Sequence, residues 1–217
     1  MFGKNPKRPP ENTDGSLLFV QEIFPTIQAE GIFAGRPAIF IRLGGCNLAC
    51  SFCDTEFENF SQMSLEDILA QVQKHQVQYS KINLIVITGG EPMRQNIIPL
   101  CNKLHKNFTV QIETNGTIYR NLPDFVKVIC SPKIVNGKYT IPADGLQIDA
   151  LKFLISASLE HYNKIPDWAF DFKEIFIQPM DEQDAQKNAA NNALAVKIAM
   201  ENNLKLSIQM HKFLQIP

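Results

Sequence analysis

Residues 46–55 read Cys46-Asn47-Leu48-Ala49-Cys50-Ser51-Phe52-Cys53-Asp54-Thr55, directly after an apolar run that ends in two glycines. Three thiols lie in this stretch, separated first by three residues and then by two. A structural zinc site or a [4Fe–4S] cluster takes four protein ligands, so three thiolates on one loop leave one iron of a four-iron cluster open to a small molecule. The spacing therefore favours a reaction site. Zinc held together with a distant histidine is the alternative that the spacing leaves open.

The composition limits the kinds of function that the protein can have. With 217 residues, 45% of them apolar and 20% charged, the chain suits one globular domain with a substantial core. The net charge of -1 produces no field that attracts nucleic acid or an anionic membrane, and no apolar run approaches the roughly 20 residues that span a bilayer. Five cysteines, three of them bunched, argue for a reducing cytoplasm. We expect Cys101 and Cys130 to be buried as small hydrophobic side chains.

The N-terminal residues are basic and then proline-rich, and no apolar signal core follows them. We therefore expect a flexible leader over residues 1–16 and a single domain over residues 17–217. Within that domain, apolar and alternating segments predict strands at residues 17–24, 38–43, 82–88, 108–113, 125–130, 150–155, 174–178 and 204–210.

Helical periodicity predicts a helix that begins at Ser64 and two more over residues 97–106 and 189–202. Pro25 is expected to end the first strand, and Asn136-Gly137 predicts a hairpin turn. Strands with helices between only some of them indicate an α/β fold. Only about a dozen residues follow residue 113 before the next strand, too few for a crossover helix. We therefore expect an incomplete, partial TIM-like barrel of mostly parallel strands with fewer helices than strands.

Several predicted strands end in polar or glycine-rich loops, which is where sites gather in such folds. Gly89 and Gly90 have no side chain to keep a ligand from the backbone, although the same residues also suit a tight turn. Ser131-Pro132-Lys133 offers a hydroxyl and a cation to a carboxylate, or forms a capped turn with a solvated lysine. The segment 113–116 lies beside a cofactor or forms an Asx-type turn.

The CxxxCxxC spacing resembles the radical S-adenosylmethionine superfamily. Further segments resemble the 7-carboxy-7-deazaguanine synthase family in particular: Glu22 to Gly31, Gly35 to Ala38, Arg42 to Leu48, Cys53 to Thr55, and Gln209 to Lys212 with Pro217. The resemblance runs from about residue 22 to residue 217. Ala29 stands where that family usually has glycine, so a methyl group there narrows the pocket or excludes a positive φ angle.

The resemblance implies a set of cofactor sites. Cys46, Cys50 and Cys53 would ligate a [4Fe–4S] cluster that binds S-adenosylmethionine, and Thr55 would bind Mg²⁺. Further contacts to S-adenosylmethionine would come from Phe52, Cys53, Asp54, Gly90, Ser131, Pro132, Lys133, Gln178, Pro179, Met180 and Asp181. The implied reaction is the radical ring contraction of 6-carboxy-5,6,7,8-tetrahydropterin to 7-carboxy-7-deazaguanine with loss of ammonia, in queuosine biosynthesis.

The resemblance also implies substrate contacts and partners. The matching substrate positions are Ile27, Gln28, Ala29, Arg42, Thr88 and Pro217. A guanidinium such as that of Arg42 suits the pterin carboxylate, although alternation along the strand also allows a surface arginine. The carboxylate of Pro217 would accept hydrogen bonds from the pterin, and His211 lies nearby with its role open. A flavodoxin- or ferredoxin-type reductant and a homodimer are the implied partners.

Two other functions compete with this one. A glycyl-radical activating enzyme shares the cysteine spacing and the small size, but it needs a protein substrate, whereas the pattern of Arg42 with Gln28 to Glu30 suggests a small carboxylated one. A non-enzymatic iron–sulfur or zinc-binding protein also needs clustered cysteines. Such a protein does not require the Gly-Gly-Glu and Ser-Pro-Lys strand ends.

Overall fold

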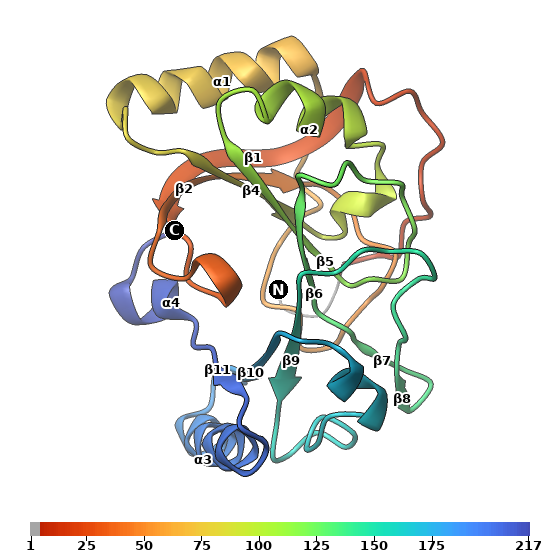
Figure 1. Ribbon diagram of the computed structural model, residues 1–217, viewed down its shortest axis with the longest axis vertical. Helices are drawn as coiled ribbons and strands as arrows, with labels where there is room; N and C mark the ends of the chain where they lie inside the picture. The colour runs from red at the N-terminus through yellow and green to blue at the C-terminus, as the bar shows by residue number, and fades with distance from the viewer. Residues whose placement is uncertain (1–4) are drawn as a thin grey trace.

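The computed structural model describes residues 5–217, and a curved nine-stranded sheet forms its frame (Figure 1). The strand order is β11-β10-β9-β6-β5-β4-β2-β1-β3. The sheet strands are β1 (Leu17–Ile27), β2 (Pro37–Leu43), β3 (Ser61–Ser64), β4 (Leu84–Gly89), β5 (Thr109–Thr114), β6 (Lys127–Cys130), β9 (Ala150–Ile155), β10 (Ile175–Pro179) and β11 (Lys205–Leu206).

Pairs from β2 through to β11 are parallel, and only the pairs of β1 with β2 and with β3 are antiparallel. The sheet does not close on itself, because β3 and β11 are its two ends. The predicted α/β incomplete barrel is therefore confirmed. The hairpin at Asn136 and Gly137 is confirmed as well: both residues have positive φ, as a tight hairpin turn requires, between β7 (Ile134–Val135) and β8 (Lys138–Tyr139).

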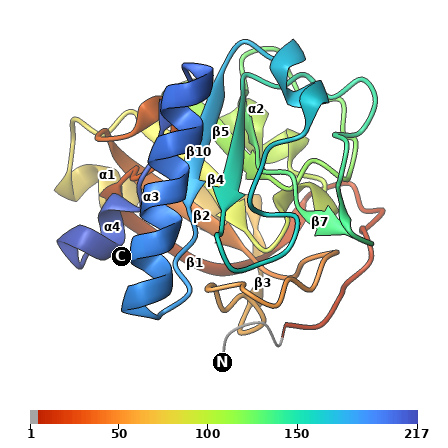
Figure 2. The same cartoon turned by 90° about the horizontal axis from the view of Figure 1, so that it is seen from below.

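Helices are fewer than strands in the described residues, as expected. They are α1 (Leu65–Gln78), α2 (Ile98–Leu104), α3 (Ala185–Asn202) and α4 (Met210–Leu214). The Ser64 hydroxyl caps α1 by accepting from the Asp67 amide, which confirms the predicted start of this helix. Figures 1 and 2 show α1 and α2 on one part of the curved sheet and α3 beside β10.

The hydrophobic core has two main clusters, one beneath α1 and α2 and one beneath α3. One cluster joins α1 and α2 to β1, β2, β4 and β5, and includes Leu18, Ile41 and Ile87. A second joins α3 to β9 and β10, and includes Phe153 and Ile177. Cys101 and Cys130 are fully buried, as predicted. No helix within residues 5–217 has the length and apolar character needed to cross a bilayer.

Three predicted boundaries differ from the structure by more than two residues. The helix predicted to begin at residue 189 begins at Ala185, with Asp184 as its N-cap, and the ends of the first and last strands are wrong as well. Pro25 does not end the first strand: β1 continues to Ile27 and pairs with β2 throughout. This costs no ladder bond because β3 covers only Leu17 to Val20, so the missing N–H of Pro25 faces an unpaired edge.

The last strand does not reach residue 210. The Ser207 amide still donates to the carbonyl of Ile177, but the next donor on β10 would be Pro179, which has no N–H. The chain therefore leaves the sheet and forms α4, which the sequence analysis missed. The short strand β3 was missed too.

The division into a flexible leader, residues 1–16, and a single domain, residues 17–217, stays a prediction. Residues 1–4 of that leader lie outside the described part of the chain. Farther along it, Lys7 forms a β-bridge with Cys46, and Glu11 forms a salt bridge with Arg94 at 2.6 Å. These contacts were not predicted from the sequence.

Candidate active site

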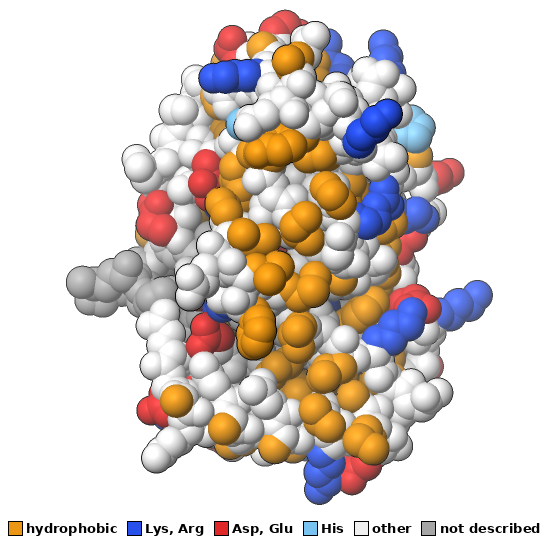
Figure 3. Space-filling model, turned by 90° about the vertical axis from the view of Figure 1, so that its left-hand side faces the viewer, with side chains coloured by type: hydrophobic (Ala, Val, Ile, Leu, Met, Phe, Trp, Pro, Cys, Tyr) orange, Lys and Arg blue, Asp and Glu red, His pale blue; other side chains and the backbone are white. Residues whose placement is uncertain are grey.

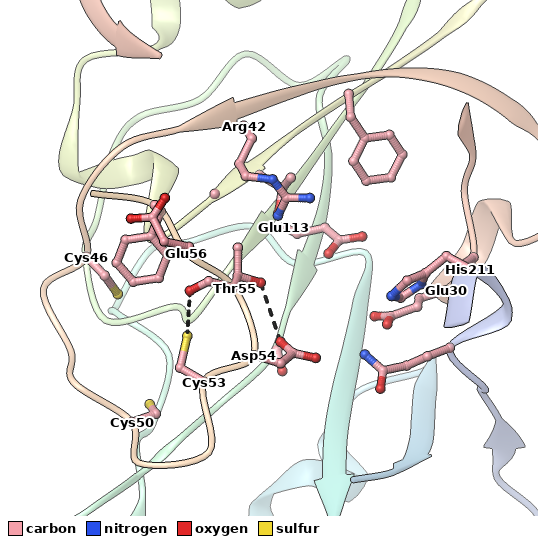
Figure 4. Close-up of a pocket in the computed structure, with 18 of the residues that line it drawn as sticks. Glu30, Arg42, Cys46, Cys50, Cys53, Asp54, Thr55, Glu56, Glu113 and His211 are labelled. Atoms are coloured by element: carbon pink, nitrogen blue, oxygen red, sulfur yellow. Dashed lines mark hydrogen bonds between the residues drawn. The ribbon is translucent and has the colours of Figure 1, made fainter. Parts of the chain in front are cut away.

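A cavity of about 780 Å³ opens on the concave side of the sheet, at the carboxyl ends of the parallel strands (Figure 4). Eighteen of the predicted site residues line it: Ile27, Gln28, Ala29, Arg42, Cys46, Cys50, Phe52, Cys53, Asp54, Thr55, Thr88, Gly90, Ser131, Lys133, Gln178, Met180, Asp181 and Pro217. Pro132 and Pro179 are not among the lining residues. The fold thus brings together segments from both ends of the chain.

Residues 46–58, which we call the thiol loop, form one side of the cavity. The loop contains neither helix nor strand, and it turns where the Cys53 amide donates to the carbonyl of Cys50 at 3.1 Å. Figure 4 shows the sulfurs of Cys46, Cys50 and Cys53 around a common space. Their arrangement fits a cluster held by three thiolates with one open position. Within residues 5–217, no three His, Cys, Asp or Glu side chains converge as a site for a single metal ion.

The thiols are protonated in the absence of iron. Burial raises the pKa of Cys46 to about 12, and burial also raises the pKa values of Cys50 and Cys53. The ammonium of Lys133 opposes the shift at Cys50, since it favours the thiolate. Lys133 donates to the carbonyl and hydroxyl oxygens of Ser131 at 2.7 and 2.6 Å. Ligation must therefore displace protons from all three thiols.

The Gly-Gly-Glu end of β4 packs directly against the start of the thiol loop. A Cβ atom on Gly90 would lie 2.2 Å from the carbonyl oxygen of Gly45, so only glycine allows this approach. The buried Glu91 carboxylate accepts from the amides of Met93 and Asn115 and from the Thr114 hydroxyl. Glu91 therefore holds the strand end in shape and does not face a ligand.

Of the two alternatives considered for residues 113–116, the structure shows the Asx turn at Asn115; a place beside the cofactor stays a prediction. The side-chain oxygen of Asn115 accepts from the Thr117 amide at 2.9 Å, as in an Asx turn. Its amide group donates to Asn47 of the thiol loop at 2.9 Å, and the residue lines the cavity. The turn thus supports the loop that carries the thiols.

On the opposite side lies a set of polar residues that we call the charged wall: Gln28, Glu30, Glu113, Lys152 and Gln178, all buried except Glu113, which is partly buried. The ammonium of Lys152 is hydrogen-bonded to Glu30 and lies 3.7 Å from Glu113. Gln178 donates to Glu30 at 3.1 Å, and Gln28 donates to Glu113 at 2.8 Å. Two carboxylates share one ammonium, so this wall offers net negative charge and acceptor oxygens to a ligand rich in N–H groups.

The charges of this wall stabilise one another. Burial opposes ionisation of Glu30, but Lys152 outweighs it and lowers the pKa of that carboxyl. Burial likewise opposes the Lys152 ammonium, and Glu113 and Glu30 more than compensate and raise its pKa. His211 also lines the cavity, and burial lowers its pKa while Glu30 opposes that shift. The imidazole of His211 is therefore neutral at pH 7.

Glu30 and Lys152 were not predicted as site residues from the sequence. The available signal was Lys152 itself, a charged residue in the middle of the apolar strand β9. Such a residue is almost never fully buried without a partner. Glu30 lies three residues after the end of β1, in a segment that carries the family resemblance.

Arg42 lies on β2 and is partly buried. It is therefore neither a fully exposed surface arginine nor a fully buried site residue. Its Nε donates to Glu22 at 2.7 Å, and its guanidinium lies 5.5 Å from the centre of the Phe24 ring. Figure 4 shows Arg42 above Thr55 at the cavity. The Thr55 hydroxyl is 3.4 Å from a carboxylate oxygen of Asp54.

The C-terminal segment closes one side of the cavity. Lys212 donates to Asp54 at 2.6 Å and to Asp181 at 2.9 Å, and so joins the thiol loop to the segment after β10. The Thr26 hydroxyl donates to an oxygen of Pro217 at 2.7 Å. Ala29 is buried and is not among the residues with positive φ, so its methyl group fits the backbone conformation found here.

Comparison with known proteins agrees with this geometry. The family model of the Radical SAM superfamily matches residues 40–165. The chain is 52% identical to 7-carboxy-7-deazaguanine synthase of Rickettsia prowazekii (strain Madrid E), with 100% of this chain and 96% of that protein covered. It is 35% identical to 7-carboxy-7-deazaguanine synthase of Rhodospirillum rubrum, with 100% of both chains covered.

A solved structure shares the fold. The crystal structure of QueE from Escherichia coli matches with a TM-score of 0.72 and 26% sequence identity, over 89% of this chain and 94% of that one. Membership of the radical S-adenosylmethionine superfamily implies a [4Fe–4S] cluster and S-adenosylmethionine as cofactors. The chain is therefore a member of the 7-carboxy-7-deazaguanine synthase family, within the radical S-adenosylmethionine superfamily.

Proposed function

We propose that the chain converts 6-carboxy-5,6,7,8-tetrahydropterin to 7-carboxy-7-deazaguanine, a carbon–nitrogen lyase reaction that contracts a ring and releases ammonia on the route to queuosine. One observation carries the proposal. A single cavity of about 780 Å³ has three thiols on one side and buried carboxylates and amides on the other. This volume is typical of sites for small molecules and cofactors. It suits a sulfonium cofactor and a bicyclic substrate lying side by side.

Cys46, Cys50 and Cys53 would hold the [4Fe–4S] cluster. Together with S-adenosylmethionine, the bound cluster supplies the hydrogen-atom abstraction that starts the reaction. The residues proposed to bind S-adenosylmethionine are Phe52, Cys53, Asp54, Gly90, Ser131, Pro132, Lys133, Gln178, Pro179, Met180 and Asp181. For Phe52 and Lys133 the support is local: Phe52 packs edge-on against Tyr162 at 5.2 Å, and the ammonium of Lys133, which lines the cavity, favours the thiolate of Cys50.

The proposed substrate residues are Ile27, Gln28, Ala29, Arg42, Thr88 and Pro217. Gln28 belongs to the charged wall, whose acceptor oxygens complement the N–H-rich edge of a pterin. Arg42 uses its Nε for Glu22, which leaves its terminal nitrogens for the substrate carboxylate. Pro217 would accept a hydrogen bond from the amino group of the pterin. These residues orient the substrate and exclude water from it.

The proposal extends to Mg²⁺ and to partners. Thr55 would offer its hydroxyl oxygen to Mg²⁺, which accepts few protein ligands and keeps several waters. A flavodoxin- or ferredoxin-type protein would supply electrons. A homodimer is supported by exposed apolar side chains on the edge strand β11 and in the chain after it, Leu206, Ile208, Phe213 and Leu214. Figure 3 shows a band of apolar side chains on the side of the molecule where Figure 1 places α4. Five free cysteines support a reducing cytoplasm. The proposal includes no nucleic-acid or membrane partner.

The test is anaerobic reconstitution of the cluster, followed by incubation with S-adenosylmethionine, reductant, Mg²⁺ and the carboxytetrahydropterin. Formation of 7-carboxy-7-deazaguanine, measured by mass spectrometry, is expected. Cleavage of S-adenosylmethionine without this product would point to a different radical substrate, as in a glycyl-radical activating enzyme. An intact cluster without any cleavage would point to a non-enzymatic iron–sulfur protein. Either outcome contradicts the proposal.

A further inference from the structure

Residues 5–11, which we call the N-terminal strap, run along the thiol loop. Lys7 forms a parallel β-bridge with Cys46, and the Arg8 amide donates to the carbonyl of Cys46 at 2.7 Å. The side-chain amide of Asn5 donates to the carbonyl of Thr55 at 2.9 Å. The strap therefore touches the loop at both ends of its cysteine motif.

Two ion pairs anchor the strap. Arg8 donates through Nε and Nη2 to one carboxylate oxygen of Glu58 at 2.8 and 2.6 Å, and its guanidinium lies 5.1 Å from the centre of the Phe60 ring. Glu11 pairs with Arg94 at 2.6 Å, and the buried Arg94 also donates to the carbonyl of Gly44 at 3.2 Å. Gly44 precedes the thiol loop and Glu58 ends it, so the anchors fix both of its ends.

Asn5 has a more specific position. Its Nδ2 lies 3.9 Å from the sulfur of Cys53, in addition to its bond to the carbonyl of Thr55. The protonated thiol of Cys53 itself points its S–H at that carbonyl, 3.6 Å away. A thiolate has no S–H. When Cys53 ligates the cluster, its sulfur and the carbonyl oxygen of Thr55 would therefore face each other as two hydrogen-bond acceptors. The two N–H groups of Asn5 are placed to donate to both of them.

We propose that the N-terminal strap positions the cluster: Asn5 donates a hydrogen bond to the Cys53 thiolate and raises the reduction potential of the cluster, while Arg8 holds the thiol loop in its ligating shape. Hydrogen bonds to ligand sulfurs are among the factors that set cluster potentials. A donated N–H stabilises the more negatively charged, reduced state. The proposal rests on the proposed ligation by Cys46, Cys50 and Cys53.

The role of Asn5 is tested in Asn5→Leu, which keeps the approximate size of the side chain and removes the donor. We expect a more negative midpoint potential in a redox titration followed by electron paramagnetic resonance, with unchanged iron content. Asn12→Leu, at an exposed asparagine just beyond the strap, is the matched control and should titrate like wild type. Equal potentials in Asn5→Leu and wild type would overturn the role of Asn5. A wild-type protein that takes up no cluster would instead contradict the proposed ligands.

The role of Arg8 is tested without any cluster, by hydrogen exchange of the metal-free protein. Arg8→Met should speed exchange several-fold in residues 46–58 and leave the core strands unchanged. Arg36→Met is the control, because Arg36 also lies over a phenyl ring, that of Phe33 at 4.7 Å, and donates to Asn83 away from the loop. Unchanged exchange of the thiol loop in Arg8→Met would overturn the positioning role, whatever the cluster does.

Discussion

The thiol loop and the charged wall face each other across one cavity, but different forces shape them. The thiol loop has no regular secondary structure, and its ligands carry protons until iron replaces them. The charged wall is built largely on strands, and Lys152 is already paired with Glu30 and lies 3.7 Å from Glu113. One side is therefore completed by its cofactor, whereas the other is completed by folding. Substitutions in the thiol loop should therefore change the cluster content, and substitutions in the charged wall should change the free energy of unfolding.

The largest expected effect is on the thiol loop. Cys50→Ala should abolish cluster content and cleavage of S-adenosylmethionine, because three thiolates are the minimum set. Cys50 is partly exposed, so the free energy of unfolding of the metal-free protein should change by less than about 0.5 kcal/mol. Iron analysis and urea unfolding measure the two quantities.

Cys101→Ala is the control for this prediction. It removes a fully buried thiol far from the loop in sequence and should leave cluster content intact while costing about 1 kcal/mol of stability. A Cys50→Ala protein that still binds a full complement of iron would contradict the statement that the thiol loop is completed by its cofactor.

On the charged wall we expect the reverse: a large loss of stability with no loss of cluster content. Lys152→Met removes the one ammonium shared by Glu30 and Glu113, and leaving buried carboxylates unpaired should cost about 3–5 kcal/mol. The folded variant should still take up its cluster. Adding Glu30→Gln should recover part of the loss, because it removes one of the orphaned charges.

The same variant should change the response to pH. In the wild type Lys152 lowers the pKa of Glu30, so the stability from this carboxyl is present above its unfolded pKa and is lost as the pH falls through the folded value. Without Lys152, burial raises that pKa, so acidification from pH 7 to pH 5.5 should stabilise Lys152→Met. Urea midpoints at both values measure the effect. A variant that loses stability over this range would show that Glu30 keeps its charge by other means.

Thr55→Ala should have a smaller effect, on activity alone. We expect normal cluster content, a loss of Mg²⁺ dependence, and a fall in kcat/KM of about tenfold, equivalent to about 1.4 kcal/mol. Thr55→Ser keeps the hydroxyl and should restore activity. Loss of iron in Thr55→Ala to the extent seen in Cys50→Ala would mean that Thr55 supports the loop and not Mg²⁺.

The smallest effect is expected for Lys212→Met. Lys212 is partly exposed, and such ion pairs contribute less than about 1 kcal/mol. Burial opposes ionisation of Asp181, but Lys212 and nearby donors together outweigh it and lower the pKa of Asp181 to about 2. The contribution of this carboxyl is therefore present above its unfolded pKa and lost as the pH falls toward 2. The stability difference between wild type and Lys212→Met should shrink over that range in acid-unfolding curves, and a constant difference would contradict the pairing.

The two sides also differ in how far the sequence predicts them. The thiol loop is local, since its three cysteines are neighbours in the chain and their spacing alone indicates a metal centre. Strands such as β4 and β9 are likewise predicted by short apolar runs. The charged wall is not local. Glu30, Glu113 and Lys152 lie on separate segments, and only the order of strands in the sheet brings them together.

Errors of prediction arose where a neighbour decides the structure. Pro25 is acceptable in β1 because β3 is too short to pair beside it, and the length of β3 is not visible around residue 25. Pro179 ends the ladder to β11 from the other strand, and so residue 210 begins a helix instead of continuing a strand. The Asn5 contact to the thiol loop spans 50 residues to Thr55 and leaves no local pattern.

The contact between Lys212 and Asp54 joins residues 158 positions apart. Closing so long a loop has a high entropic cost, and such contacts form late in folding. The clusters around α1 and α2 and around α3 both lie upstream of Lys212 and can consolidate before it docks. We therefore expect the side of the cavity next to the thiols to close last. The folding chain would then stay open longest where a bulky inorganic cofactor has to enter.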